Sequence, residues 1–417
     1  MPALPENLQL VPLTAERLPD VLELDRWAFP APETLEELLG VPSPLPWERT
    51  FGVIDPDEPG RLLAMHASYP FAHCPVPGAQ LPVAGLTWVG VHPEQRRRGI
   101  LRAMIATHFE HCRGWAEPVS MLFAAEPAIY GRFGYGLAAR QVRLTLPRRA
   151  ALRPVPGTEE VRVRIDNRTA ERHTALISDL HAGSRRPGWV TRETPELVAA
   201  WMDDSPLFRD GHETARIAIA ERAGRPVGYA LFRRKGEWND GVATGTVRVT
   251  EVVAPDAAVA HALWKRLLDL DLTTEVTTGP LPVDDPLLSL LVDLRATRPR
   301  LQDNVWARLI DLPAALAGRR YAADLDVVLE VADADLAANA GRWRLTAPAF
   351  GPAEVRRTTA EPDLGLDVRE LGAAYLGGVS LHELAAAGLV RATDDGRLAR
   401  ASIAFGWPHA PGSSWVF

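Results

Sequence analysis

The chain contains very little cysteine and lysine. Among its 417 residues there are two cysteines, Cys74 and Cys112, and two lysines, Lys235 and Lys265. A single disulfide would be a poor framework for so long a chain, so we expect two free thiols in a reducing cytoplasm. The formal net charge is -7 even though arginine is abundant. Neither nucleic acid nor an anionic membrane is therefore expected as a partner.

Long apolar runs and a leader peptide are also missing. No run approaches the roughly 18 residues that a membrane-spanning helix needs. The N-terminal stretch MPALPENLQLVPLTAERLPD has no basic segment followed by an apolar one, which a secretory signal would show. The hydrophobic content of 47% and charged content of 24% are typical of a globular protein. The length suggests about two or three domains.

Several signatures of common enzyme classes are absent. The chain has neither the nucleophile elbow G-x-S-x-G nor the phosphate loop G-x-x-x-x-G-K-[ST]. His382 and Glu383 begin an H-E-x-x-H zinc motif, but Ala386 stands where its second histidine belongs. Two other groups could supply metal ligands but have no fourth ligand nearby in sequence: His108, His111 and Cys112, and His66, His73 and Cys74. We therefore expect no metal.

Hydrophobic periodicity predicts a mixed α/β layer at the start of the chain. Its strands are expected at residues 8–13, 50–54, 62–69, 83–91 and 119–125. Its helices are expected after an N-cap at Thr14, at 34–39 and at 99–115, with a short helix and turn over 126–136.

The pattern returns after a linker at 147–157. Residues 217–235 predict a hairpin with its turn at AGRP, and residues 246–270 predict a strand, a loop and a helix. When Val253 is aligned with Val91, the strand and helix repeat, but Arg96, Arg97, Arg98 and Gly99 are replaced by Ala258, Val259, Ala260 and His261. We interpret this as an internal repeat whose loop has lost its chemistry.

The last part of the chain has a different pattern. Strands are expected at 324–333 and 342–347, followed by two short helices within 371–390 that are separated by a glycine break.

A basic loop, HPEQRRRGIL, joins the strand at 83–91 to the helix at 99–115. The first N–H groups of a helix lack partners within the helix, and the helix dipole makes this end attractive to anions. Gly99 lets the backbone approach a phosphate closely, and the arginines add matching donors. The loop therefore predicts a diphosphate site. The alternative is a helix start that is merely basic and solvated.

Downstream of the loop stands AAEPAIYGRFGYG, residues 124–136. Together with RRRGIL it resembles the Eis (enhanced intracellular survival) family of GNAT N-acetyltransferases. In GNAT proteins the phosphate loop has the form Arg/Gln-x-x-Gly-x-Gly/Ala; Leu101 departs from it, as the RRRGLL-like loops of Eis members do. The resemblance covers the whole chain. It implies an α/β catalytic GNAT domain (1–147), a degenerate GNAT-like domain (158–300) and a sterol-carrier-protein-like α+β domain (301–417).

The resemblance also implies acetyl-CoA as co-substrate and assigns site residues. The cofactor would be bound by Val89, Gly90, Val91, Arg97, Arg98, Gly99, Ile100, Leu101, Arg102, Ala125 and Glu126. Tyr130 aligns with the general acid of the family, although a purely structural aromatic is the alternative, and Tyr135 is treated as structural. The general base would be the C-terminal carboxylate of Phe417, on an apolar tail that its composition predicts to be docked.

A carboxylate beside aromatic side chains suits a cationic amine, which makes Asp25 and Trp27 candidates for acceptor binding. Glu33 and Glu36 are expected on a solvated acidic face. The resemblance implies N-acetylation of primary amines on a small polycationic acceptor such as an aminoglycoside, by direct transfer in a ternary complex within a homo-hexamer. Other members can carry an acidic residue at the position of Val416, so its replacement bears on polycation affinity. The alternatives are acetylation of a protein lysine or N-terminus, and a non-catalytic acyl-CoA- or lipid-binding protein.

Overall fold

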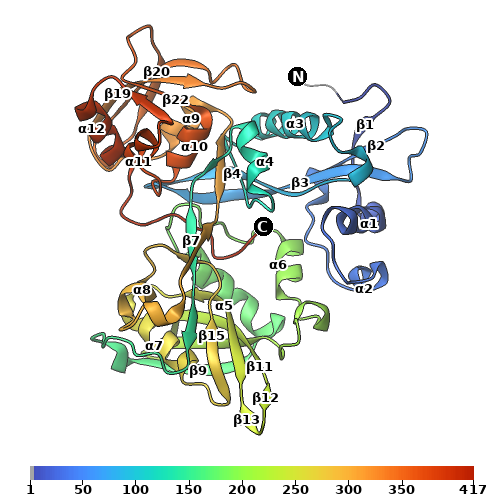
Figure 1. Cartoon of the computed structure of the whole chain (residues 1–417), viewed down its shortest axis with the longest axis vertical. Coiled ribbons are helices and arrows are strands. Elements are labelled where there is room, and N and C mark those ends of the chain that lie inside the picture. Colours follow the sequence, from blue (N-terminus) through green and yellow to red (C-terminus); the bar gives the residue numbers. More distant parts are fainter. Residues whose placement is uncertain (1–3) are drawn as a thin grey trace.

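The computed structural model describes residues 4–417, and Figure 1 shows three bodies along the chain. The first, in blue and cyan, and the third, in orange and red, lie above the second, in green and yellow. Each body is a mixed α/β unit with its own sheet, as the sequence predicts. Among the described residues, no helix is both long and apolar enough to span a bilayer.

The first body is built on a seven-stranded sheet in the order β1-β2-β3-β4-β5-β18-β6. Its early strands are β1 (Gln9–Pro12), β2 (Thr50–Ile54), β3 (Leu62–Val76), β4 (Ala79–Val91), β5 (Val119–Leu122) and β6 (Gly136–Leu137). Its helices are α1 (Leu18–Ala28), α2 (Leu35–Leu39), α3 (Ile100–Gly114) and α4 (Pro127–Tyr130). The seventh strand, β18 (Trp306–Leu309), returns from far along the chain and lies antiparallel between β5 and β6.

The hairpin of β3 and β4 is longer than the strands expected at 62–69 and 83–91. Proline usually interrupts a strand, yet Pro70 and Pro75 both lie within β3 and pair with β4. The neighbouring strand β2 follows β3 only as far as Ala67, so β3 has a free edge beyond that residue. Proline is tolerated in an edge strand because no ladder hydrogen bond is lost there.

Two helix starts in the first body differ from each other. Thr14 does not cap α1, because a 3-10 turn at Ala15–Arg17 intervenes and the Thr14 hydroxyl contacts Glu16 instead. Thr34 does cap α2, in a capping box with Glu37. The expectation at Thr14 was therefore wrong, whereas the helix expected at 34–39 is confirmed.

The second body has a six-stranded sheet in the order β8-β15-β14-β11-β10-β9. Its strands are β8 (Thr145–Pro147), β9 (Val161–Asn167), β10 (Arg216–Arg222), β11 (Arg225–Lys235), β14 (Gly245–Val253) and β15 (Thr273–Thr277). Its helices are α5 (Ala170–Ala182), α6 (Pro195–Met202), α7 (Ala257–Leu268) and α8 (Pro286–Leu290). A small hairpin, β12 (Trp238–Asn239) and β13 (Val242–Ala243), projects from this body. The predicted turn at AGRP is confirmed: Ala223 and Gly224 have positive φ angles of 51° and 74°, as a two-residue hairpin turn requires.

A separate three-stranded sheet lies along the connection between the first and second bodies. It has the order β16-β7-β17, with β16 (Leu281–Pro282), β7 (Arg140–Arg143) and β17 (Arg300–Asp303). The chain thus passes from the first body to the second through β7 and returns through β17 to β18.

The third body has a five-stranded sheet in the order β21-β20-β19-β22-β23. Its strands are β19 (Leu325–Ala332), β20 (Gly341–Ala347), β21 (Glu354–Arg357), β22 (Leu364–Asp367) and β23 (Val390–Ala392). Its helices are α9 (Leu312–Gly318), α10 (Val368–Tyr375), α11 (Leu381–Ala386) and α12 (Asp395–Phe405). The predicted strands at 324–333 and 342–347, and the glycine break between two short helices, are confirmed.

A buried ion pair joins the third body to the first. Arg308 on β18 donates to Asp333 at 2.7 Å, and the two side chains are 0% and 1% exposed. The other oxygen of Asp333 accepts a hydrogen bond from Asn339 at 3.1 Å. Both charges are therefore fully withdrawn from water and depend on each other.

Replacing Asp333 with alanine should destabilise the chain strongly, because it leaves the Arg308 charge buried and unpaired. The expected loss is about 3–5 kcal/mol of unfolding free energy, measured by urea denaturation. Asp326→Ala is the control: Asp326 pairs with Arg344, but its side chain is 54% exposed, so the loss should stay within about 1 kcal/mol. Equal losses in the two variants would contradict this account of the interface.

Candidate functional site

Strands β4 and β5 separate part of the way along the first sheet. They pair in parallel only between Val83–Gly85 and Val119–Met121. Beyond Gly85, β4 stays paired with β3 up to Val91, through a bulge at which Trp88 has a φ of 51°. The edge of β4 that faces β5 therefore has no strand partner over its last residues, Leu86 to Val91. Free backbone groups along such an edge can pair with an extended ligand, as an added strand would.

The start of α3 lies at the end of this unpaired edge. Gly99 adopts the left-handed conformation with φ 84°, and no atom lies within 4 Å of where its Cβ would stand. The first hydrogen bond of the helix runs from the Ala103 N–H to the Gly99 carbonyl. Within residues 4–417, none of the N–H groups from Arg97 to Arg102 donates a hydrogen bond. These free donors have the arrangement that an anion site needs.

The arginines around this helix start are exposed. Arg98 contacts Gln95, and Arg102 lies 3.4 Å from Asp335 while its side chain stays 53% exposed. Exposure alone fits both a diphosphate site and a solvated helix start. The free N–H groups and the conformation of Gly99 favour the diphosphate site.

The strand end, the loop and the downstream motif meet in one apolar cluster. Val89, Leu101 and Tyr130 all pack in it, against the buried side chains of α3. Ala125 and Glu126 follow β5, are exposed, and lead directly into α4. The strand end, the helix start and α4 are thus joined by one apolar cluster; the role of the residues expected to hold the cofactor stays a prediction.

The two tyrosines of the segment IYGRFGYG, residues 129–136, have different surroundings. The Tyr135 hydroxyl is fully buried and lies 2.8 Å from the Ser120 hydroxyl, which in turn lies 2.8 Å from His108 Nε2. The Tyr130 hydroxyl makes no hydrogen bond within the described residues. Burial, together with nearby Glu126, raises the pKa of Tyr130 to about 12. Tyr130 is therefore the tyrosine whose proton is free to be donated, and it is protonated throughout the physiological range.

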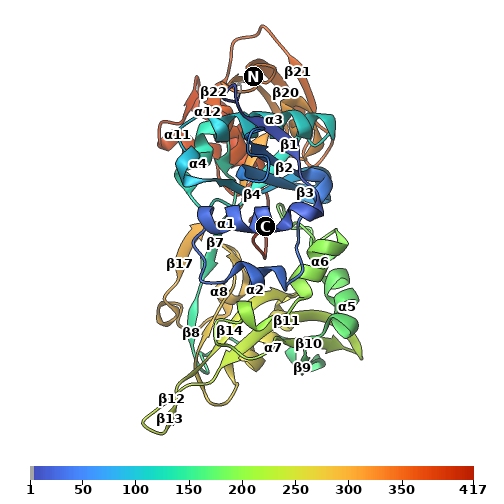
Figure 2. The ribbon, with the colours of Figure 1, turned by 90° about the vertical axis from the view of Figure 1, so that its right-hand side faces the viewer.

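The C-terminus is docked between the first and second bodies, as both views show (Figures 1 and 2). The Phe417 ring packs edge-on against Phe71 of β3 and against Phe123, just after β5, at 4.9 and 5.1 Å between ring centroids. No ion pair joins the terminal carboxylate to a basic side chain of residues 4–417. The chain end thus lies where β5 ends, with its carboxylate unpaired. The role of Phe417 as a base stays a prediction.

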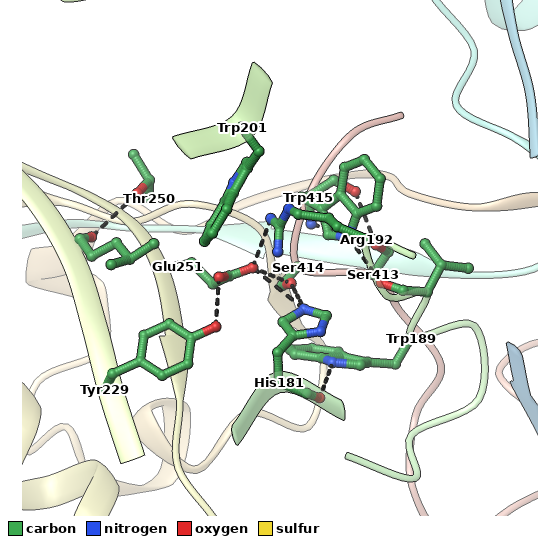
Figure 3. Close-up of polar contacts among 12 residues, drawn as sticks. His181, Trp189, Arg192, Trp201, Tyr229, Thr250, Glu251, Ser413, Ser414 and Trp415 are labelled. Atoms are coloured by element: carbon green, nitrogen blue, oxygen red, sulfur yellow. Dashed lines mark hydrogen bonds and ion pairs between the residues drawn. The ribbon is translucent and has the colours of Figure 1, made fainter. Parts of the chain in front are cut away.

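A buried polar cluster in the second body anchors this tail (Figure 3). Glu251 on β14 accepts hydrogen bonds from Ser414 at 2.6 Å, Tyr229 at 2.7 Å and Arg192 at 3.1 Å. His181 Nε2 lies 3.0 Å from the Ser414 hydroxyl. Burial alone would raise the pKa of Glu251, but Arg192, His181 and Ser414 outweigh it and hold the pKa well below its ordinary value.

Aromatic contacts extend the anchor along the tail. The Arg192 guanidinium lies between two indole rings, 3.7 Å from the Trp201 centroid and 4.6 Å from that of Trp415. The Trp415 indole N–H donates to the Val190 carbonyl at 2.8 Å. The sequence analysis did not predict this cluster. Its one indication was Glu251, the acidic residue within the apolar strand TVRVTEVV.

The second body repeats the strand and helix of the first without its anion site. In the alignment of Val253 with Val91, the bulge of β14 at Thr250 matches the bulge at Trp88. The helix that follows, α7, begins directly after Asp256, whose carboxylate accepts the Val259 N–H at 2.9 Å. A carboxylate of the chain thus caps the start of α7, whereas the first N–H groups of α3 have no such partner within residues 4–417.

The acceptor candidates lie on α1, which packs on β3 and β4. Trp27 is 55% exposed, and its ring lies 5.1 Å from that of His92, which follows β4. Asp25 is half-buried, and burial raises its pKa to about 6. Trp27 therefore lies beside the residue that follows β4, and the role of either side chain in acceptor binding stays a prediction.

The histidines considered as metal ligands are not gathered around a common point. His108 is paired with Ser120, and His66 is buried with both ring nitrogens lacking a partner. No three His, Cys, Asp or Glu side chains among residues 4–417 are gathered as metal ligands. Cys74 and Cys112 are both buried and unbridged.

Comparison with known proteins places each body in a family. Models of the acetyltransferase (GNAT) domain match residues 9–138 and 188–309, and a model of the sterol carrier protein domain matches residues 312–413. An uncharacterised N-acetyltransferase of Streptomyces coelicolor is 38% identical over 94% of this chain and 98% of its own length. The N-acetyltransferase Eis of Mycobacterium tuberculosis is 34% identical over 87% of each chain.

A solved structure agrees with these relatives. The crystal structure of Eis1 from Mycobacterium abscessus superposes with a TM-score of 0.81 and 30% identity, covering 98% of this chain and 100% of the other. GNAT domains use acetyl-CoA, which fits the free helix start at Gly99 and the unpaired edge of β4. The relatives support a catalyst rather than a non-catalytic lipid-binding protein. The chain is an acetyltransferase, and it belongs to the Eis family of GNAT N-acetyltransferases.

Proposed function

We propose that this enzyme transfers the acetyl group of acetyl-CoA to a primary amine of a small cationic acceptor, such as an aminoglycoside, in a complex that holds both substrates. The observation that carries the proposal is the meeting of the unpaired edge of β4 with the uncapped start of α3, next to Tyr130 and the chain end. This arrangement can hold a diphosphate and an extended thioester arm while an amine approaches from the tail side.

The residues that would hold acetyl-CoA follow from this geometry. The N–H groups from Arg97 to Arg102 would receive the diphosphate, and Arg97 and Arg98 would add charge. The backbone of Val89–Val91 would pair with the pantetheine arm, and Ala125 and Glu126 would border it. When bound, acetyl-CoA supplies an activated acetyl thioester. An N–H near Val91 that meets the thioester oxygen would stabilise the charge that develops there, by about 2.7–4 kcal/mol per donor.

Tyr130 would donate the proton that the leaving thiolate requires. Its pKa of about 12 lies some 3.5 units above that of a thiol near 8.5, a difference of roughly 5 kcal/mol. The transfer is therefore unfavourable as an isolated step. It becomes feasible when the hydroxyl is held against the sulfur and charge develops on both atoms together.

The terminal carboxylate of Phe417 would remove a proton from the amine. The pKa of an ordinary terminal carboxylate, near 3.5, lies about 6.5 units below that of an ammonium near 10, a difference of roughly 9 kcal/mol. The step therefore needs help from the water-excluding rings around Phe417, or from a water molecule between the two groups.

Asp25 would attract the cationic acceptor, and its titration gives a pH test. The pKa of about 6 means that the carboxylate is ionised above pH 6 and becomes neutral below it. Attraction for a cation is therefore present at pH 7.5 and lost toward pH 5. We expect the KM for a cationic acceptor to rise as the pH falls through 6, while the KM for acetyl-CoA does not follow.

Asp25→Asn should raise the acceptor KM at pH 7.5 and remove this pH-dependent rise. Glu23→Gln is the matched control, because Glu23 lies on the same helix and its side chain is 50% exposed. An Asp25→Asn enzyme with the wild-type pH profile of acceptor KM would contradict the role of Asp25.

A panel of acceptors tests the proposed function. The enzyme is mixed with acetyl-CoA and an aminoglycoside, a simple monoamine or a lysine-containing peptide, and release of free thiol is followed. Fastest turnover with the aminoglycoside supports the proposal. Turnover with the peptide alone would favour protein acetylation, and no thiol release with any amine would overturn the proposal. We further propose that the enzyme acts in the cytoplasm as a homo-hexamer, as the family resemblance implies.

A further inference from the structure

A pocket rich in arginine opens beside the anchored tail. Its volume is about 440 Å³, and the second body, the β7–β17 sheet and the tail all contribute to its wall. Its charged lining consists of Arg143, Arg192, Arg248, Arg300 and Glu251. Four arginines thus face one glutamate, an excess of three positive charges in a chain whose net charge is -7. The pocket includes no residue of the helix start at Gly99, but its wall reaches Val416, next to the terminal residue Phe417.

Two of these arginines lack a carboxylate partner. Arg143 on β7 and Arg300 on β17 are directly opposite each other in an antiparallel pair. Neither forms an ion pair or a side-chain hydrogen bond within residues 4–417. Like charges in opposite positions of a strand pair destabilise a sheet. Burial, with Arg300 nearby, also lowers the pKa of Arg143.

The other two arginines are only partly satisfied. Arg192 forms an ion pair with Glu251, which also accepts a hydrogen bond from Ser414 of the tail. Arg248 lies 3.4 Å from Asp210, but the Asp210 side chain is 82% exposed, so this pair contributes little. The Nε atoms of Arg143, Arg192 and Arg248 are all buried without a hydrogen-bond partner. An unpaired donor of a charged group is costly to bury, so the neighbouring residues among 4–417 satisfy these arginines only in part.

A neutral donor lies in the same wall, next to the residue that follows Arg143. The Thr278 hydroxyl oxygen accepts the Leu144 N–H at 2.9 Å, which leaves its hydrogen free to donate. Gly279 allows this segment to lie against β14, since a Cβ there would stand 2.3 Å from the Thr250 carbonyl oxygen. Hydroxyl donors beside arginine forks form the kind of surface that carboxylate and phosphate oxygens prefer.

We propose that this pocket binds a small oxyanion ligand, one that carries several carboxylate groups or a phosphate ester, through Arg143, Arg248 and Arg300. Trp415 and Val416 form part of the same wall, so the bound ligand contacts the tail that ends in Phe417. The ligand thereby stabilises the docked tail from the side opposite to the first body.

Calorimetric titration of the full chain tests the site, with citrate and pyrophosphate as probes. Saturating coenzyme A is present in every titration, so that pyrophosphate does not occupy the loop at Gly99. We expect one of the two probes to bind, and Arg143→Gln and Arg300→Gln each to weaken its binding about tenfold or more. Tighter binding of citrate would identify a carboxylate ligand, and tighter binding of pyrophosphate a phosphate ligand. Arg225→Gln, at an exposed hairpin turn, is the control and should bind like the wild type.

Thermal unfolding of the unligated variants gives a second readout. Because Arg143 and Arg300 repel each other, removing either charge should leave the melting temperature unchanged or raise it. No binding of either probe, or equal binding in wild type and variants, would overturn the proposal. A clear fall in melting temperature in Arg300→Gln would also overturn it, since the arginines would then be structural. None of these readouts needs acetyl transfer, so failure of the proposed function is distinguished from failure of this site.

Discussion

Extending the chain by two glycines after Phe417 should lower kcat roughly 100- to 10,000-fold, the range that general acid–base groups contribute. The extension moves the terminal carboxylate by up to about 7 Å but leaves every side chain of the tail in place. The anchor at Glu251 and Ser414 lies upstream of the addition and should hold the tail as before. The dissociation constant for acetyl-CoA should stay within about twofold, because the loop at Gly99 is not touched.

The control carries the same two glycines between Asp240 and Gly241, in the exposed turn of the β12–β13 hairpin. This variant should have wild-type kcat. Full activity of the C-terminal extension would remove the terminal carboxylate from the mechanism. Loss of acetyl-CoA binding in the extension would show that the tail supports the cofactor site rather than the acceptor.

Replacing Tyr130 with phenylalanine is the second change with a large expected effect. The substitution removes one hydroxyl that has no hydrogen-bond partner among residues 4–417, so folding should be little affected. The proton donor for the thiolate is lost, and kcat should fall roughly 100- to 10,000-fold. Steady-state kinetics at saturating acetyl-CoA measure this loss directly.

Tyr135→Phe is the matched control for Tyr130→Phe. Tyr135 shares the motif and the apolar cluster, but its hydroxyl is bonded to Ser120. Its loss removes one buried hydrogen bond while Ser120 keeps His108 as a partner, so it should cost about 0.5–1.5 kcal/mol of stability and leave kcat nearly unchanged. If Tyr135→Phe abolished turnover and Tyr130→Phe did not, the two roles assigned here would have to be exchanged.

The sequence predicts best what depends on neighbouring residues. The strand, the arginine loop and the helix at Gly99 could be predicted because a helix start, its free N–H groups and its glycine all lie within one short segment. The degenerate repeat was also visible, since Ala258, Val259 and Ala260 stand where the loop has Arg96, Arg97 and Arg98.

Contacts between distant parts of the chain could not be predicted. Glu251 and Ser414 are 163 residues apart in the sequence. A charged residue inside a strand does not reveal which distant side chains will form hydrogen bonds with it once it is buried. Periodicity likewise gave no sign that Trp306–Leu309 would enter the first sheet between β5 and β6. The length of β3 could not be predicted for a related reason. Whether a strand continues through a proline depends on whether the fold leaves an unpaired strand edge beside it.

The site in the first body rests on one claim, that the helix start at Gly99 receives the diphosphate of acetyl-CoA while its counterpart at α7 is closed by Asp256. Calorimetric titration of the full chain with acetyl-CoA tests this directly through the number of sites. We predict that one acetyl-CoA binds per chain. The Gly99→Val variant should bind it more weakly, because the backbone of a β-branched residue cannot adopt a φ of 84° without strain. No binding, two molecules per chain, or unchanged affinity in Gly99→Val would contradict the claim.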